Sequence, residues 1–200
     1  GSRRIAEEKS SAARSASPSW GLGVEMKGGL GVGALNPPKP STAAQAVDSA
    51  NVFCGEGNLG LRFNKRISGG LSVSWSVSKY DQDAGLAGNW EVTQALVAGN
   101  LYGQYNILTG RFRPYLKASL GSFGTGMTVV DKQTRSALAV VAPDSAMHYA
   151  VSLGGDLGFT KRFSGFLEAQ YHGFQFDPDP ATQFNALIGI GYTFANIFDF

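Results

Sequence analysis

The chain has 200 residues, of which 43% are hydrophobic and 16% charged, and its formal net charge is +2 at pH 7. This length fits one domain with or without a tail, and the nearly balanced charge does not indicate a nucleic-acid partner. A single cysteine, Cys54, excludes an internal disulfide. No apolar run approaches the roughly 18 residues of a transmembrane helix. The sequence therefore predicts one domain without helical membrane spans.

The N-terminal segment differs in composition from the rest of the chain. Residues 1–18 are small, charged and rich in Ser and Ala, and they carry no apolar stripe. Such a segment buries too little apolar surface to fold on its own. We therefore expect a flexible N-terminal tail at 1–18 and a single folded domain at 19–200.

Apolar and polar residues alternate from Ser19 onward, and this period of two indicates β-strands rather than helices. The clearest case is GLSVSWSVSKY at 70–80, where Leu71, Val73 and Val77 alternate with serines. In chain order the same pattern predicts eight strands, at 20–35, 52–63, 70–80, 90–107, 114–123, 147–159, 166–174 and 184–194.

The connections between the predicted strands alternate between two kinds. Short basic turns lie at 64–69, 108–113 and 160–165, and long polar loops lie at 36–50, 81–89, 130–146 and 175–183. In an up-and-down meander the short and long connections lie at opposite ends of the sheet. The fold class predicted is therefore an all-β, eight-stranded antiparallel up-and-down barrel.

The environment of the apolar face distinguishes two classes of barrel. A soluble barrel of the lipocalin kind buries its apolar face, whereas an outer-membrane barrel turns that face to lipid. The low charge, the alternating turns and strands that match the roughly 9–11 tilted residues needed to cross hydrocarbon favour lipid. Aromatic residues at both strand ends are typical of interfacial girdles. They are Trp20, Phe63, Tyr105, Tyr115, Phe159, Tyr192 and Phe194 near the short turns, and Phe53, Tyr80, Trp90, Phe123, Phe176 and Phe184 near the long loops. A soluble barrel that binds a hydrophobic ligand is the less favoured alternative.

The polar face would then line the barrel interior. An eight-stranded barrel is just wide enough for its own side chains, and charges shut away from water must be paired or hydrated. We therefore expect a polar network that plugs the barrel. The alternative is a narrow, porin-like path for ions or small solutes. The residues predicted to form the network are Glu25, Lys27, Glu56, Arg62, Lys117, His148, Asp156, Glu168 and His172.

The end of the chain, IGIGYTFANIFDF, places Tyr192, Phe194, Phe198 and Phe200 in one register. It resembles the C-terminal recognition strand of bacterial outer-membrane proteins, and with eight strands the chain resembles the small barrels of the OmpA/OmpX type. One departure is that ANIFDF continues past the Tyr-Thr-Phe where many such strands end, which leaves the operative aromatic residue open. The resemblance implies an integral protein of the Gram-negative outer membrane with both termini in the periplasm. It also implies contact with outer-membrane lipid and lipopolysaccharide, and with the barrel-assembly machinery that reads the C-terminal strand.

No catalytic or metal-binding pattern is evident around the two histidines. Some small outer-membrane barrels are deacylases that place a Ser two residues after the His, but Phe174 stands there after His172. Two isolated histidines and scattered carboxylates also lack the spacing of metal ligands. We therefore expect no enzyme, cofactor or metal. The long loops would serve a structural, adhesion or partner-binding role, and a protein partner would meet them or the N-terminal tail.

The short turns are basic and the long loops mostly acidic. The basic residues are Lys65, Arg66, Arg111, Arg113, Lys161 and Arg162. One hypothesis is that this basic rim lies against anionic phospholipid headgroups on the periplasmic side. A solvated rim without a lipid partner is the alternative.

Overall fold

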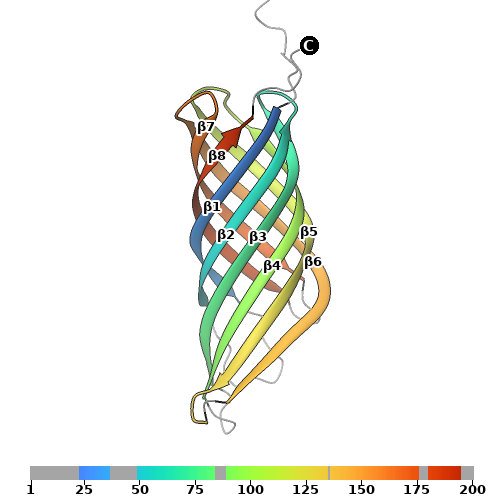
Figure 1. Cartoon of the computed structure of the whole chain (residues 1–200), viewed down its shortest axis with the longest axis vertical. Helices are drawn as coiled ribbons and strands as arrows, with labels where there is room; N and C mark the ends of the chain where they lie inside the picture. The colour runs from blue at the N-terminus through green and yellow to red at the C-terminus, as the bar shows by residue number, and fades with distance from the viewer. Residues whose placement is uncertain (1–22, 37–48, 84–88, 135, 176–179, 195–200) are drawn as a thin grey trace, which may run out of the picture.

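The computed structural model describes residues 23–36, 49–83, 89–134, 136–175 and 180–194. Eight antiparallel strands pair in chain order and close into a barrel (Figure 1). They are β1 (Gly23–Asn36), β2 (Ala50–Arg62), β3 (Ile67–Asp83), β4 (Asn89–Asn106), β5 (Phe112–Asp131), β6 (Ala137–Gly158), β7 (Phe163–Phe174) and β8 (Ala181–Thr193). β8 pairs with β1, so every strand has a neighbour on both sides. The predicted fold class is confirmed. The described residues include no helix that is long and apolar enough to cross a membrane.

Side chains along each strand alternate between the barrel interior and the outer surface. In β3, Leu71 and Val73 are 59% and 54% exposed, whereas Ser72 and Ser74 between and beside them are buried. At the middle of β8, Ile188 is 66% exposed. A monomeric soluble protein rarely exposes a large contiguous apolar surface, and a belt of exposed aliphatic residues is what contact with hydrocarbon requires. The apolar face therefore points outward, as expected for a lipid-facing barrel.

The predicted loop at 130–146 is mostly strand. β5 and β6 continue as a hairpin in which Val130 pairs with Ala137, with one shift of register between Phe123 and Thr125. Such a shift is typical of a β-bulge. The run Thr-Val-Val at 128–130 is β-branched, which favours extended backbone over loop. Polar composition alone therefore misplaced this boundary.

Four consecutive strands project beyond the others at the long-loop end. β3 to β6 have 17, 18, 20 and 22 residues, whereas the other four strands have 12 to 14. In Figure 1 they reach the bottom of the view, and the short turns lie at the top. Two ion pairs lie there: Lys79 on β3 contacts Glu91 on β4 at 2.9 Å, and Lys132 in the turn after β5 contacts Asp81 on β3 at 2.7 Å.

A hydrogen-bonded turn closes the tip of the β5–β6 hairpin. The carboxylate of Asp131 accepts hydrogen bonds from the backbone N–H of Gln133 (2.8 Å) and the hydroxyl of Thr134 (2.7 Å). These donors hold the pKa of Asp131 below its ordinary value of 3.8, because they stabilise the charged form. The turn is therefore held by a charged carboxylate at neutral pH.

Two of the short turns share one hydrogen-bonding scheme. Asn64 accepts, at 2.7 Å each, from the backbone N–H groups of the second and third residues after it. Thr160 does the same at 3.1 and 2.9 Å. The similar sequences NKRISG and TKRFSG thus follow from one turn geometry in which a side-chain oxygen caps the backbone.

The aromatic residues of the predicted girdles lie on both sides of the barrel wall. Phe53, Phe63, Tyr105, Phe159, Phe184 and Phe194 lie on the outer surface, with exposures of 53%, 44%, 44%, 59%, 55% and 42%. Tyr192 is half-buried, and Trp20 and Phe176 lie outside the described residues. Four assignments are wrong because position near a strand end says nothing about register. Tyr115 and Phe123 are buried in the interior, and Tyr80 and Trp90 are half-buried in the inward register.

Tyr115 shows why the interior accepts an aromatic ring. Its side chain points inward in the same register as Lys117, and its hydroxyl donates to Glu168 at 2.6 Å. Gly154 is its partner on β6, and a Cβ atom at that glycine would meet the ring. A glycine opposite an inward tyrosine therefore provides the space that the ring fills.

Candidate functional site

The barrel interior gathers the charged residues that the sequence singled out. Eight of the nine predicted interior side chains are buried, and the Arg62 side chain is 20% exposed at the short-turn end. They come from β1 (Glu25, Lys27), β2 (Glu56, Arg62), β5 (Lys117), β6 (His148, Asp156) and β7 (Glu168, His172). Because the strands close into a barrel, residues distant in sequence meet across the interior.

Lys117 is at the centre of the first cluster. Its ammonium lies 2.5 Å from Glu56 on β2 and 2.6 Å from Glu168 on β7. The amide of Gln170 donates to both carboxylates, to Glu168 at 2.8 Å, and the hydroxyl of Tyr115 donates to Glu168. This Lys117 cluster connects three strands across the barrel and saturates its buried charges with hydrogen bonds, as buried ions require.

A second set of ion pairs lies toward the short turns. Lys27 contacts Asp156 at 2.9 Å, and Arg113 lies 3.8 Å from the same carboxylate. Arg62 donates to Glu25 at 2.7 Å. Arg113, expected on the basic rim, is half-buried and points inward, so the prediction for this residue is wrong. Together with the Lys117 cluster, four cations face four carboxylates in the interior.

The two histidines form a hydrogen-bonded chain. His148 bonds to the side-chain oxygen of Asn100 at 2.6 Å and to His172 at 2.9 Å. His172 bonds in turn to Gln170 at 2.8 Å, and the His148 ring stacks on Phe174 with centroids 4.8 Å apart. Both imidazoles are thus held by interior side chains. The described residues include no group of three or more His, Cys, Asp or Glu placed to hold a metal ion.

A cluster of buried apolar side chains also fills the interior, which the sequence analysis did not foresee. Phe123 and Phe174 pack edge to face with centroids 5.0 Å apart. Consecutive apolar residues, such as Val52-Phe53 and Leu96-Val97, indicate this cluster in the sequence. Neighbouring residues of a strand point to opposite faces, so such a pair places one apolar side chain inside the barrel and one outside. The cluster comprises Leu35, Ala50, Val52, Cys54, Leu96, Ala98, Phe123, Phe166, Phe174, Ala181 and Leu187.

Little free volume remains where the polar and apolar clusters meet. A cavity lined by Ser76, His172 and Gln183, among others, measures about 10 Å³. This is the lower limit for a single water molecule. The side chains themselves occupy this part of the barrel.

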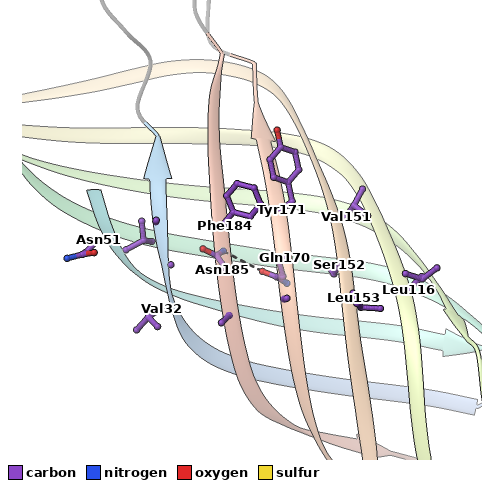
Figure 2. A pocket seen from close by; sticks show the side chains of 15 residues that line it. Val32, Asn51, Leu116, Val151, Ser152, Leu153, Gln170, Tyr171, Phe184 and Asn185 are labelled. Carbon is purple, nitrogen blue, oxygen red and sulfur yellow. Dashed lines mark hydrogen bonds between the residues drawn. The ribbon is translucent and has the colours of Figure 1, made fainter. Parts of the chain in front are cut away.

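The outer surface carries a broad apolar depression. It measures about 1030 Å³, and Figure 2 shows Val32, Phe184, Tyr171 and Val151 around it on neighbouring strands. Outward-facing alanines of these strands, including Ala186, are smaller than their neighbours and leave the surface hollow there. In a bilayer, hydrocarbon chains fill a hollow of this kind.

Comparisons with known proteins agree with this geometry. A family model described as "outer membrane protein beta-barrel domain" matches residues 10–195. The structure of Ail, the attachment invasion locus protein of Yersinia pestis, is 13% identical, with a TM-score of 0.50 and coverage of 88% of this chain and 99% of that one. Neisserial surface protein A (NspA) is 14% identical, with a TM-score of 0.52 and coverage of 86% and 97%. A search of curated protein sequences finds no match.

Proposed function

We propose that this chain, which belongs to the outer membrane protein beta-barrel domain family, serves as a structural, adhesion or partner-binding platform in the outer membrane rather than as an open channel. The observation that carries this proposal is the filled interior. The Lys117 cluster crosses the barrel between three strands, and the apolar cluster packs beside it. Water and ions need a hydrated path, which these side chains occupy.

The surface available to a partner is at the long-loop end. β3 to β6 extend past the other strands (Figure 1). Their hydrogen-bonded backbone holds the side chains of this extension beyond the rest of the barrel. A rigid sheet positions contact residues with less loss of conformational entropy than a free loop. This supports recognition of a protein or glycan partner by the projecting strands.

The channel alternative is tested by conductance. The purified chain, refolded in detergent and added to a planar bilayer, is expected to give no steady single-channel openings, because the interior is cross-linked by ion pairs. A known open porin added under the same conditions is the positive control. Discrete, long-lived openings of the wild-type chain would replace the platform with a narrow channel of the same fold.

We also propose that the short turns and both termini face the periplasm and that the projecting strands face outward. Single cysteines test this, because native Cys54 is 1% exposed inside the barrel and gives little background. Lys132→Cys at the hairpin tip is expected to react with a membrane-impermeant maleimide on intact cells. Lys65→Cys in a short turn is expected to react only after permeabilisation. The opposite pattern would reverse the orientation.

We further propose two molecular contacts for this platform. The outward aliphatic belt supports contact with outer-membrane lipid and lipopolysaccharide. Tyr192 and Phe194 share the outward register of β8, which supports recognition of this strand by the barrel-assembly machinery. Phe198 and Phe200, the other two residues of the predicted signal, lie outside the described residues, as does the N-terminal tail at 1–18.

A further inference from the structure

The mouth of the barrel at the short-turn end contains a basic pocket. It measures about 320 Å³, and five cationic side chains line it: Arg62, Arg111, Arg113, Lys161 and Arg162. We call it the mouth pocket. Two of its walls are the turns that precede β5 and follow β6. They are joined by Arg111, whose backbone oxygen accepts from the N–H of Gly158 at 2.9 Å and whose Nε donates to the oxygen of Gly158 at 3.1 Å.

The mouth pocket has an excess of positive charge. Glu25 pairs with Arg62, and Asp156 is shared by Lys27 and Arg113. Within the part of the chain that the structure describes, no carboxylate lies within ion-pair distance of the other three cations that line it. Six cations, counting Lys27 below the pocket, thus face two carboxylates, an excess of four charges. A concave site of one sign concentrates counter-ions.

Two buried donors of this pocket lack a partner. The Nε atoms of Arg62 and Arg113 are buried and have no hydrogen bond among the described residues. Because both Nε atoms are buried, a ligand in the mouth pocket is expected to meet the exposed part of these two side chains, which are 20% and 18% exposed. A guanidinium offers its donors as a planar fork that matches the oxygens of a phosphoryl group.

We propose that the mouth pocket binds a phosphoryl group, carried either by a soluble phosphate ester or by a phospholipid headgroup. The volume lies at the small end of the roughly 300–1,000 Å³ typical of ligand sites. A headgroup has access because Phe159 and Phe163, which line the same pocket, are 59% and 50% exposed on the outer surface. The proposal does not depend on the platform function.

The chain provides a matched control for this site. Lys65 and Arg66 occupy the same positions in the turn after β2 as Lys161 and Arg162 do in the turn after β6. The two arginines make equivalent bonds, Arg66 to the hydroxyl of Tyr105 at 3.1 Å and Arg162 to that of Tyr192 at 3.5 Å. Removing either pair changes the net charge of the protein by the same amount, but only Lys161 and Arg162 line the mouth pocket.

Isothermal titration calorimetry of the full chain in uncharged octyl glucoside micelles, with inorganic pyrophosphate at low salt, tests the proposal. One saturable site per chain is expected. The double variant Lys161→Gln/Arg162→Gln is expected to raise Kd at least about tenfold, because it removes two charge-assisted contacts. Lys65→Gln/Arg66→Gln is expected to raise Kd less than about threefold, since it changes only the longer-range field. A heated-versus-unheated gel verifies that both variants are folded.

Competition then identifies the source of the phosphoryl group. Displacement of pyrophosphate by monomeric dihexanoyl phosphatidylglycerol at lower concentration than by glycerol phosphate indicates a lipid headgroup. Equal displacement indicates a soluble phosphate ester. The proposal is overturned if the wild-type chain shows no saturable binding, or if both double variants weaken it equally, because the attraction would then belong to the basic end as a whole.

Discussion

Replacing Lys117 with methionine is expected to lower the free energy of unfolding by about 3–5 kcal/mol, the range for breaking a buried ion pair by removing one partner. The Lys117 ammonium lies between Glu56 and Glu168, and both carboxylates are buried. Methionine has nearly the same length, so packing is kept while the positive charge is lost. Two carboxylates would then face each other in the interior without a cation.

The effect is measured by urea unfolding in phosphatidylcholine vesicles, followed by tryptophan fluorescence and by mobility on unheated gels. Lys79→Met is the matched control, because Lys79 pairs with Glu91 at 2.9 Å while its side chain is 63% exposed. Exposed pairs contribute about 0–1 kcal/mol. If Lys117→Met unfolds at the wild-type midpoint, the interior carboxylates are hydrated, which would favour the channel alternative.

Replacing Ile188 with arginine is expected to cost about 2–4 kcal/mol in vesicles, as for a charge on the lipid face near the bilayer midplane. Ile188 is 66% exposed at the middle of β8, where it pairs with Leu30 on β1 and Leu167 on β7. The three outward side chains form one aliphatic surface. The guanidinium of an arginine at position 188 would therefore be placed against the hydrocarbon of the bilayer.

Phe159→Arg is the control for depth. Phe159 is 59% exposed in the turn after β6, and charges near the interface cost only about 0–1 kcal/mol. Guanidinium chloride unfolding of both variants in the same vesicles gives the comparison. Equal, negligible effects of the two substitutions would contradict a hydrocarbon environment around the middle of β8.

Alternation of residue types predicts which side of the wall each residue occupies, because the period of a strand is fixed by backbone geometry. This is why the serines of β3 and the charged residues of β1 and β7 were placed inside from sequence alone. The same rule applied to Tyr115 would have placed it inside, beside Lys117. The error came from using proximity to a strand end, which is independent of register.

Contacts across the interior could not be predicted in the same way. Lys117 and Glu56 are 61 residues apart, and their meeting depends on how the strands are staggered when the barrel closes. The sequence contains several carboxylates of the same register and does not say which one faces which cation. The mouth pocket could not be predicted from the sequence for the same reason. Arg62 lies beside the turns before β5 and after β6 only because the barrel closes.

The consecutive order of the long strands makes the loop end of the molecule lopsided. β3 to β6 extend to the bottom of the view on one side of the barrel, while β7, β8, β1 and β2 end before them on the other side (Figure 1). A large molecule approaching along the membrane plane would meet the projecting strands β3 to β6 from one direction, and among the described residues it would meet no strand of that height from the other. Contacts with neighbouring molecules in a crowded membrane therefore have a preferred direction around the barrel axis. A barrel whose strands all had the same length would have no such preference.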